Sequence, residues 1–149
     1  MDLYHNRVLE LASDIPHLGR LWAPDGSALK TARICGSTVL VDLRLSEDAT
    51  HITEIGVEPK ACALGQAVTA ILAENAIGAI LADLQYAREA LNDMLKSGGE
   101  PPTGRFWELR HLEGVRDYPP RHGSTLLAFE AALEAFKEAE LSRAKTQIL

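Results

Sequence analysis

The spacing of hydrophobic positions changes several times along the chain, and each change indicates a new element. Apolar residues recur at helical intervals from residue 2 to residue 15, where Pro16 ends the predicted helix. Strict alternation then runs from Thr38 to Leu45, which is typical of a half-buried strand. The alternation places the apolar residues Val39, Val41, Leu43 and Leu45 on one face of the strand. It places the polar residues Asp42 and Arg44 on the other face. We expect the polar face, including Asp42, to meet solvent.

Two further extended segments flank this strand. One is predicted from Ala28 to Ile34, and Cys35-Gly36-Ser37 then forms a tight hairpin connection, since Gly can supply a positive φ. The other is predicted from His51 to Val57 and is closed by Pro59, which cannot donate to a ladder. Three consecutive strands on short turns imply an antiparallel meander.

The remaining segments have helical patterns. A helix that is buried on most sides is predicted from Ala63 to about Ile80, with Gly78 as a point of interruption. An amphipathic helix is predicted at Ala82–Lys96, and a short helix at Phe106–Leu112 is anchored by Phe106, Trp107 and Leu109. Asp117–Arg121 is expected to be extended, because each residue before a proline avoids the helical region. The last helix is predicted to be capped by Ser124 or Thr125 and to fray from Lys137. The predicted fold is α+β, a three-stranded antiparallel sheet with helices on one face, in a single domain spanning residues 1–149.

Composition narrows the function. The chain has 149 residues, 46% hydrophobic content and a net charge of −6 without a basic block, which argues against nucleic acid as the main partner. The longest apolar stretch, residues 76–82, is too short to span a membrane. Two distant cysteines without an export signal indicate a reducing cytoplasm and no disulfide.

Those two cysteines are the candidate reactive groups. Cys62 stands where the long helix begins, and unpaired N–H groups with the helix dipole favour a thiolate there. Cys35 lies in the predicted hairpin turn. The residues alone leave open whether these sulfurs form an active pair or are two ordinary buried cysteines.

The order of these motifs resembles the U-type iron–sulfur scaffold proteins (NifU N-terminal, IscU and SufU). Leu3-Tyr4 with Leu18-Gly19 is similar to the family's opening helix and its exit. Ile34-Cys35-Gly36-Ser37 resembles the Cys-Gly-Asp motif, and Cys62-Ala63-Leu64-Gly65-Gln66-Ala67 resembles Cys-Ala-Ile-Ser-Gln-Ala. Residues 114–121 resemble the Gly-Val-Arg-Glu-Phe-Pro-Ala-Arg of the SufU branch, and the long interval after Cys62 also points to that branch. The resemblance implies a SufE/IscU-like fold.

The resemblance also implies ligands, several of which are missing here. The family holds zinc or a nascent cluster with three cysteines and one aspartate. In this chain the aspartate position is Ser37, and the third cysteine position is Ser124. Cys35 and Cys62 carry over as metal or cluster ligands, with Ser37 and Ser124 lining the site and His122 as a third metal ligand. Arg121 is expected to point into the site and act there electrostatically.

Three functions remain open at this point. The first is a scaffold or sulfur and iron carrier in iron–sulfur cluster assembly, with Cys35 as a persulfide acceptor and a labile cluster or iron as cargo. The second is a zinc-dependent sulfurtransferase of SufU type, and the third a non-catalytic paralogue that serves as an interaction module. The residues do not decide whether the protein is an enzyme. The resemblance implies a SufS-like cysteine desulfurase and apo-protein acceptors as partners. A homodimer, in which two chains contribute Cys35 and Cys62 each, is a further alternative.

Overall fold

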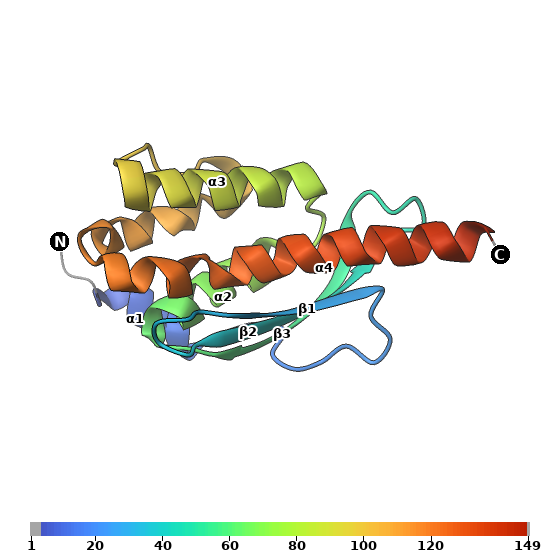
Figure 1. The fold of residues 1–149 in the computed structure, drawn as a ribbon, viewed down its shortest axis with the longest axis horizontal. Helices are drawn as coiled ribbons and strands as arrows, with labels where there is room; N and C mark the ends of the chain where they lie inside the picture. Colours follow the sequence, from blue (N-terminus) through green and yellow to red (C-terminus); the bar gives the residue numbers. More distant parts are fainter. Residues whose placement is uncertain (1–3, 149) are drawn as a thin grey trace.

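Three antiparallel strands form one sheet, which helices cover on one face (Figure 1). The computed structural model describes residues 4–148. The strands are β1 (Gly26–Thr31), β2 (Thr38–Leu45) and β3 (Ile52–Lys60), in the order β1-β2-β3. The α+β fold class expected from the sequence is therefore confirmed.

The register of the sheet is set by β2, whose bounds agree with the prediction. Val41 stands opposite Ala28 of β1 and Val57 of β3. The flanking strands differ from the prediction, because β1 begins two residues early and ends at Thr31, and β3 continues through Pro59 to Lys60. A proline fits there because β3 is an edge strand that pairs with β2 alone within the sheet.

The turn between β1 and β2 is wider than the tight hairpin that the sequence suggested. The Ala32 N–H donates to Ser37 O over 2.8 Å, and the Gly36 N–H donates to Ala32 O over 2.9 Å. Gly36 has φ +72°, the left-handed conformation expected for it. The turn holds Cys35 at its tip, where the thiol is exposed.

The described residues contain four α-helices: α1 (Asn6–Ser13), α2 (Ala63–Asn75), α3 (Leu81–Ser97) and α4 (His122–Ile148). Leu3, a predicted core position of the opening helix, lies outside the described residues. The α2 helix ends at Asn75, before Ile80, and Gly78 turns the chain with φ +92°. The α4 helix starts two residues before the predicted cap and continues beyond Lys137, where fraying was expected.

Two segments of 3₁₀-helix connect α3 to α4: η1 (Gly104–Asp117) and η2 (Pro119–Arg121). The extended conformation predicted for residues 117–121 is therefore wrong. Only Tyr118 is non-helical, with φ −128° and ψ 72°, because the residue before a proline avoids the helical region. Pro119 can begin a helical turn because the first turn needs no N–H from it. Trp107, expected as an anchor, is 46% exposed.

The main core lies between the sheet and the pair α2 and α4. Its strand side is the apolar face of β2 predicted from the alternation, and Leu126, Phe129 and Phe136 of α4 belong to the same buried cluster. A glycine sets the contact between β1 and α4. A Cβ at Gly26 would lie 2.2 Å from Ala135 O and 2.5 Å from Ala139 N, so these two backbones meet with no side chain between them.

The opposite face of the sheet contains a buried carboxylate, which corrects the expectation that Asp42 is solvated. Asp42 is fully buried and accepts hydrogen bonds from Arg20 Nε at 2.6 Å, Ser27 Oγ at 2.5 Å and Leu21 N at 3.0 Å. Burial opposes ionisation, yet these hydrogen bonds and the charge of Arg20 outweigh it and lower the pKa of Asp42. Through Arg20 and Leu21, Asp42 thereby holds the segment that precedes β1 against β2.

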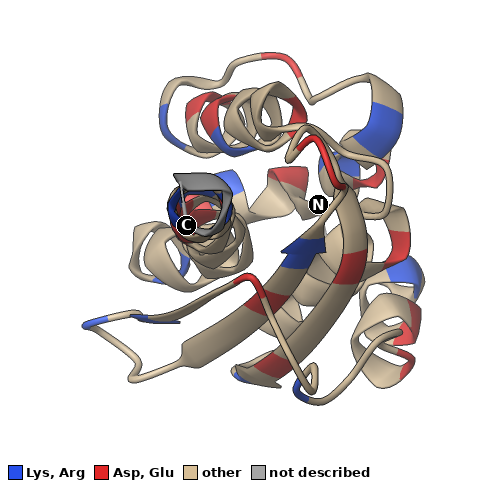
Figure 2. Cartoon of the chain, turned by 90° about the vertical axis from the view of Figure 1, so that its right-hand side faces the viewer, with Lys and Arg blue, Asp and Glu red and all other residues tan. Residues whose placement is uncertain are grey.

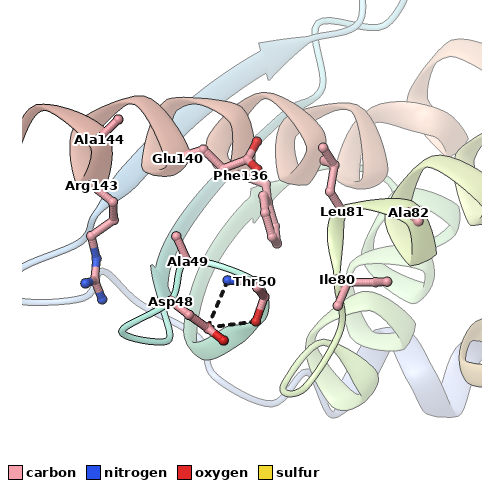
Figure 3. Close-up of a pocket in the computed structure, with 10 residues that line it drawn as sticks. All are labelled: Asp48, Ala49, Thr50, Ile80, Leu81, Ala82, Phe136, Glu140, Arg143 and Ala144. Atoms are coloured by element: carbon pink, nitrogen blue, oxygen red, sulfur yellow. Dashed lines mark hydrogen bonds between the residues drawn. The ribbon is translucent and has the colours of Figure 1, made fainter. Parts of the chain in front are cut away.

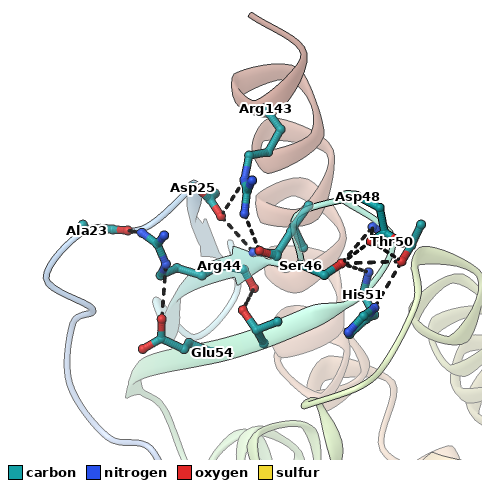
Figure 4. Close-up of polar contacts among 11 residues, drawn as sticks. Ala23, Asp25, Arg44, Ser46, Asp48, Thr50, His51, Glu54 and Arg143 are labelled. Carbon is teal, nitrogen blue, oxygen red and sulfur yellow. Dashed lines mark hydrogen bonds and ion pairs between the residues drawn. The ribbon is translucent and has the colours of Figure 1, made fainter. Parts of the chain in front are cut away.

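The turn between β2 and β3 is closed by side chains (Figure 4). Asp48 accepts hydrogen bonds from Ser46 Oγ at 2.6 Å and from the Thr50 hydroxyl at 2.8 Å. These bonds lower the pKa of Asp48 to about 2. Nearby, Arg143 of α4 donates to Leu45 O and pairs with Asp25 over 3.2 Å, which joins the helix to this end of the sheet.

Charged residues are spread over the elements. Figure 2 shows acidic and basic residues on both the helices and the strands. Among the described residues, no helix has the length and apolar character needed to cross a membrane.

Candidate functional site

Both cysteines come to the same end of the molecule. Cys35 lies in the β1–β2 turn and Cys62 immediately precedes α2, and both segments lie at the end of the fold where α4 begins (Figure 1). The C-terminal end of α4 lies at the opposite end. Residues 27 positions apart in the sequence thus contribute to one surface.

Cys35 is exposed and has polar neighbours. Its sulfur lies 3.1 Å from Ser37 Oγ, and Ser37 itself is buried. Hydrogen bonding from the Ser37 side chain, then from the Ser37 backbone, lowers the pKa of the Cys35 thiol, and the Ser124 hydroxyl adds to this effect. The turn therefore favours the thiolate, which is the nucleophilic and metal-binding form.

Cys62 occupies the N-cap of α2, as the sequence predicted. Its backbone is extended, with φ −67° and ψ 171°, and Gln66 N donates to its carbonyl over 2.9 Å. A Cβ at Gly65 would lie 2.8 Å from Ala61 Cβ, four residues earlier in the chain, and 3.4 Å from Ser124 O in the first turn of α4. This contact places the Cys62 end of α2 next to the first turn of α4.

Arg121 links the two cysteines electrostatically. Its pKa is raised, first by a hydrogen bond with the Cys62 side chain and further by charge interactions with Tyr4, Cys62 and Cys35. The guanidinium thus lies at the site, as the sequence predicted for it. Ser124 is buried and its hydroxyl donates to Arg121 O over 3.1 Å, so it holds the η2 turn instead of capping α4.

The His122 ring is engaged by backbone carbonyls. Its Nε2 lies 2.9 Å from Val115 O and 3.2 Å from Arg116 O, so the ring holds η1 against the start of α4. Within residues 4–148, no three His, Cys, Asp or Glu side chains lie close enough together to hold a metal ion. The structure brings Cys35, Cys62, Ser37, Ser124 and Arg121 together, and it does not add His122 as a third ligand.

A separate pocket of about 560 Å³ lies beside the C-terminal half of α4 (Figure 3). Ile80 before α3, Phe136 and Arg143 of α4, and Asp48 of the β2–β3 turn line it. Arg143 is already engaged by Asp25 and Leu45 O, and neither cysteine belongs to this pocket. It is therefore distinct from the cysteine site.

One residue to which the sequence analysis assigned no role could have been identified from its pattern. An aspartate inside a run of alternating apolar residues could have identified Asp42 as a buried, paired carboxylate. Tyr4 lies close enough to Arg121 to raise its pKa, and no local pattern in the sequence indicates this. The contact of Gly65 with Ser124 O depends on α4, which is remote in the sequence.

Comparisons with known proteins agree with this arrangement. A sequence profile of the NifU-like N terminal domain matches residues 3–104. A crystal structure of the N-terminal part of a nitrogen-fixing NifU-like protein from Brucella abortus has 42% sequence identity and a TM-score of 0.89, with 93% of this chain and 95% of that chain covered.

A more distant structure shows the same fold. It is a candidate iron–sulfur cluster assembly scaffold protein for the SUF system of Fervidobacterium islandicum AW-1, with 19% identity, a TM-score of 0.80, and 90% of this chain and 96% of that chain covered. No curated protein gave a significant match. The profile covers more than half of the chain, and the Brucella protein is similar over almost all of it, so this chain belongs to the NifU-like N-terminal domain family.

Proposed function

We propose that this protein is a scaffold and sulfur carrier for iron–sulfur cluster assembly. The observation that carries the proposal is the convergence of its only two cysteines on one surface beside Arg121, in a chain of the NifU-like family. The scaffold description of the SUF structure with the same fold supports it. In this function the cluster is cargo, which is built on the cysteines and passed to another protein.

Sulfur enters at Cys35, because it is exposed and its thiolate is favoured. The thiolate attacks the outer sulfur of a persulfide on a cysteine desulfurase. A new S–S bond forms at Cys35, the S–S bond of the donor persulfide breaks, and its electron pair leaves on the donor cysteine as a thiolate. The transfer needs no other oxidant or reductant.

Arg121 has an electrostatic role in this proposal. A guanidinium stays protonated at any physiological pH, so it provides a fixed positive charge beside both sulfurs. A persulfide and a thiolate-bound cluster are both anionic, and this charge stabilises them before transfer. Arg121 thereby favours the loaded state without forming a bond to the cargo.

The site does not fit a zinc-dependent reaction within one chain. Structural zinc takes four ligands of Cys, His or carboxylate type, and catalytic zinc takes three. The described residues bring no three such side chains together, and the His122 Nε2 atom faces backbone carbonyls. We therefore derive no step through zinc.

The proposed function requires two kinds of partner and a reducing environment. A cysteine desulfurase of the SufS type supplies sulfur, and apo-proteins accept the finished cluster. Free thiols at an exposed site persist in the cytoplasm, so we place the function there.

Single-cysteine variants test the proposal. Each is incubated with a desulfurase and cysteine, and the mass of the intact chain reports the added sulfur. We expect Cys35→Ala to lose sulfur acceptance and Cys62→Ala to keep it, so the two variants are controls for each other. Undiminished sulfur acceptance by Cys35→Ala would overturn the assignment of the acceptor.

A second measurement tests the scaffold role. The protein is reconstituted with iron and sulfide without oxygen, and the cluster is followed by its visible absorption and by transfer to an apo-ferredoxin. We expect the intact chain to transfer a cluster, and both single-cysteine variants to retain little or none. Absence of any cluster on the intact chain would rule out the scaffold role.

A further inference from the structure

The outer edge of β1 has no partner strand. The Ala32 N–H donates to Ser37 O beside β2, and along an antiparallel strand alternate residues bond to the neighbouring strand. In the observed register, the residues whose N–H and C=O groups point away from β2 are therefore Ser27, Leu29 and Thr31. Within residues 4–148, only β2 forms backbone hydrogen bonds with β1. Such an edge is a template for another strand.

The usual guard of an exposed edge is engaged elsewhere in this protein. Natural edge strands often carry a lysine that keeps other strands from pairing, and β1 contains Lys30. The Lys30 Nζ atom lies 2.7 Å from Glu134 Oε2 of α4, so this side chain lies over the face that α4 covers. Leu29, whose side chain is on the opposite face, is 60% exposed. The edge therefore presents backbone groups and an apolar side chain that a second strand can cover.

A hollow of about 420 Å³ lies beside Lys30, and its charges are self-complementary. The residues that α4 contributes to it are spaced i, i+3, i+4 and i+7, so they share one face of the helix: Glu130, Leu133, Glu134 and Lys137. In an antiparallel copy centred near Leu133, Glu130 of each chain lies opposite Lys137 of the other. With Lys30 and Arg88, the hollow has three basic and two acidic residues, which suits contact between chains that each have a net charge of −6.

We propose that β1 of a second copy of this chain pairs with this edge, antiparallel to it, about a two-fold axis at Leu29. Leu29 then stands opposite Leu29 of the second copy, and Ser27 of each chain exchanges backbone hydrogen bonds with Thr31 of the other. The two three-stranded sheets become one continuous sheet. The exposed Leu29 side chains cover each other on its outer face. This pairing goes beyond the function proposed above and does not depend on it.

The helices on the other face fit this arrangement. Neighbouring strands lie about 4.8 Å apart, and α4 contacts both β1 and β2, so it lies about half a strand spacing inward from β1. The two-fold axis lies about half a spacing outward from β1. The two α4 helices are then about 10 Å apart, a distance at which packed helices interdigitate their side chains. The stripe from Glu130 to Lys137 becomes the contact between them.

The pair keeps the two cysteine sites separate. Cys35 lies in the turn that follows β1, and the two β1 strands run in opposite directions. The two turns therefore lie at opposite ends of the joined sheet, where each remains accessible. The pair is also closed, because each copy uses its β1 edge once.

Molar mass provides the first test. It is measured by light scattering across a dilution series up to about 1 mM, under reducing conditions, on the intact chain and on a Cys35→Ala/Cys62→Ala variant. We expect both proteins to approach twice the 16.2 kDa chain mass as their concentration rises. A single-chain mass throughout, or a pair that forms only when the cysteines are present, would overturn the proposal.

Hydrogen exchange locates the contact. In the pair we expect the amides of Ser27, Leu29 and Thr31 to exchange at least about tenfold more slowly than in dilute single chains, because they become hydrogen-bonded. The Ala28 and Lys30 amides face β2 in both states and provide the internal reference. Equal exchange of the three outward amides in the pair and in the single chain would refute pairing at β1.

Leu29→Glu and Leu9→Glu are matched variants. Leu29→Glu sets two carboxylates against each other across the axis, so we expect the Kd of the pair to rise at least about tenfold. Leu9 is 47% exposed on α1, which packs on α2 and η1, so Leu9→Glu should leave this Kd unchanged. Thermal unfolding shows whether both variants are folded. If folded Leu29→Glu pairs as tightly as Leu9→Glu, the β1 interface is wrong.

Discussion

The contact between β1 and α4 predicts that Gly26→Ala destabilises the protein, against the usual effect of this change. In a strand, replacing glycine by alanine ordinarily stabilises by about 0.4–1 kcal/mol, because the unfolded chain loses freedom. At Gly26 the added Cβ would lie 2.2 Å from Ala135 O, 2.5 Å from Ala139 N and 2.9 Å from Ala139 Cβ. Two of these three atoms are backbone, so no side-chain rotation relieves the overlap.

The geometry gives the magnitude. Carbon and oxygen atoms in close contact lie about 3.3–3.6 Å apart, so β1 and α4 must separate by about 1 Å. Overpacking of this kind costs about 1–3 kcal/mol, and the backbone contact places Gly26→Ala in the upper part of that range. After the entropic gain is subtracted, we expect a net loss of about 2 kcal/mol in the free energy of unfolding, or about 4–8 °C in Tm.

Thermal and urea unfolding measure this loss, with Gly123→Ala as the control. Gly123 lies in the first turn of α4, and a Cβ there meets nothing within 4 Å. That variant should be as stable as the parent or gain up to about 1 kcal/mol, as expected for glycine in a helix. A Gly26→Ala variant as stable as Gly123→Ala would refute the reasoning, because it would show that β1 and α4 are not in backbone contact.

Three further predictions concern charged groups. Asp42→Asn should cost about 1–3 kcal/mol in chemical unfolding at neutral pH. Because the fold lowers the pKa of Asp42, its contribution is complete above the unfolded pKa and is lost as pH falls through the folded pKa, so the gap between parent and variant should close in acid and not in base. In an NMR titration the Asp48 carboxyl should have a pKa of about 2, and an ordinary value would show that its turn hydrogen bonds are absent in solution. Arg121→Ala should slow alkylation of the two cysteines several-fold and Arg121→Lys should restore part of the rate, whereas equal rates in all three proteins would remove Arg121 from the site.

The sequence predicted those parts of the fold in which local pattern and tertiary packing agree. The alternation at Thr38–Leu45 is reproduced by β2, and its apolar face is buried as expected. Cys62 is the N-cap of α2, and Gly36 adopts the positive φ expected of it. In each case one residue or a short period determines the local conformation.

The differences come from contacts between distant segments. Asp42 follows the polar phase of β2, yet Arg20 and Ser27 bury and pair it, and neither partner is marked by the local pattern. The expectation that proline ends a strand or prevents a helical turn failed twice, since Pro59 is accommodated in an edge strand and Pro119 begins a helical turn. His122 could not be assigned from the sequence, because the carbonyls that bind its ring become available only when η1 folds against α4.

The same was true of the candidate site. The spacing of motifs located Cys35, Cys62 and Arg121, and the structure places all three at one end of the fold. The roles of Cys35 as acceptor and of both cysteines as cluster ligands remain predictions. Whether a third ligand is present depends on side-chain directions, which a motif does not encode.

The outer edge of β3 has a consequence for how copies of this protein meet. Beyond the sheet, Gly19 N donates to Val57 O over 2.9 Å and Val57 N donates to His17 O over 3.0 Å. Two residues later Pro59 has no N–H to offer. An exposed strand edge is a template for joining another chain, and here a segment of the same chain and a proline block it. The outer edge of β3 is thus protected against open-ended β-aggregation by contacts within its own chain.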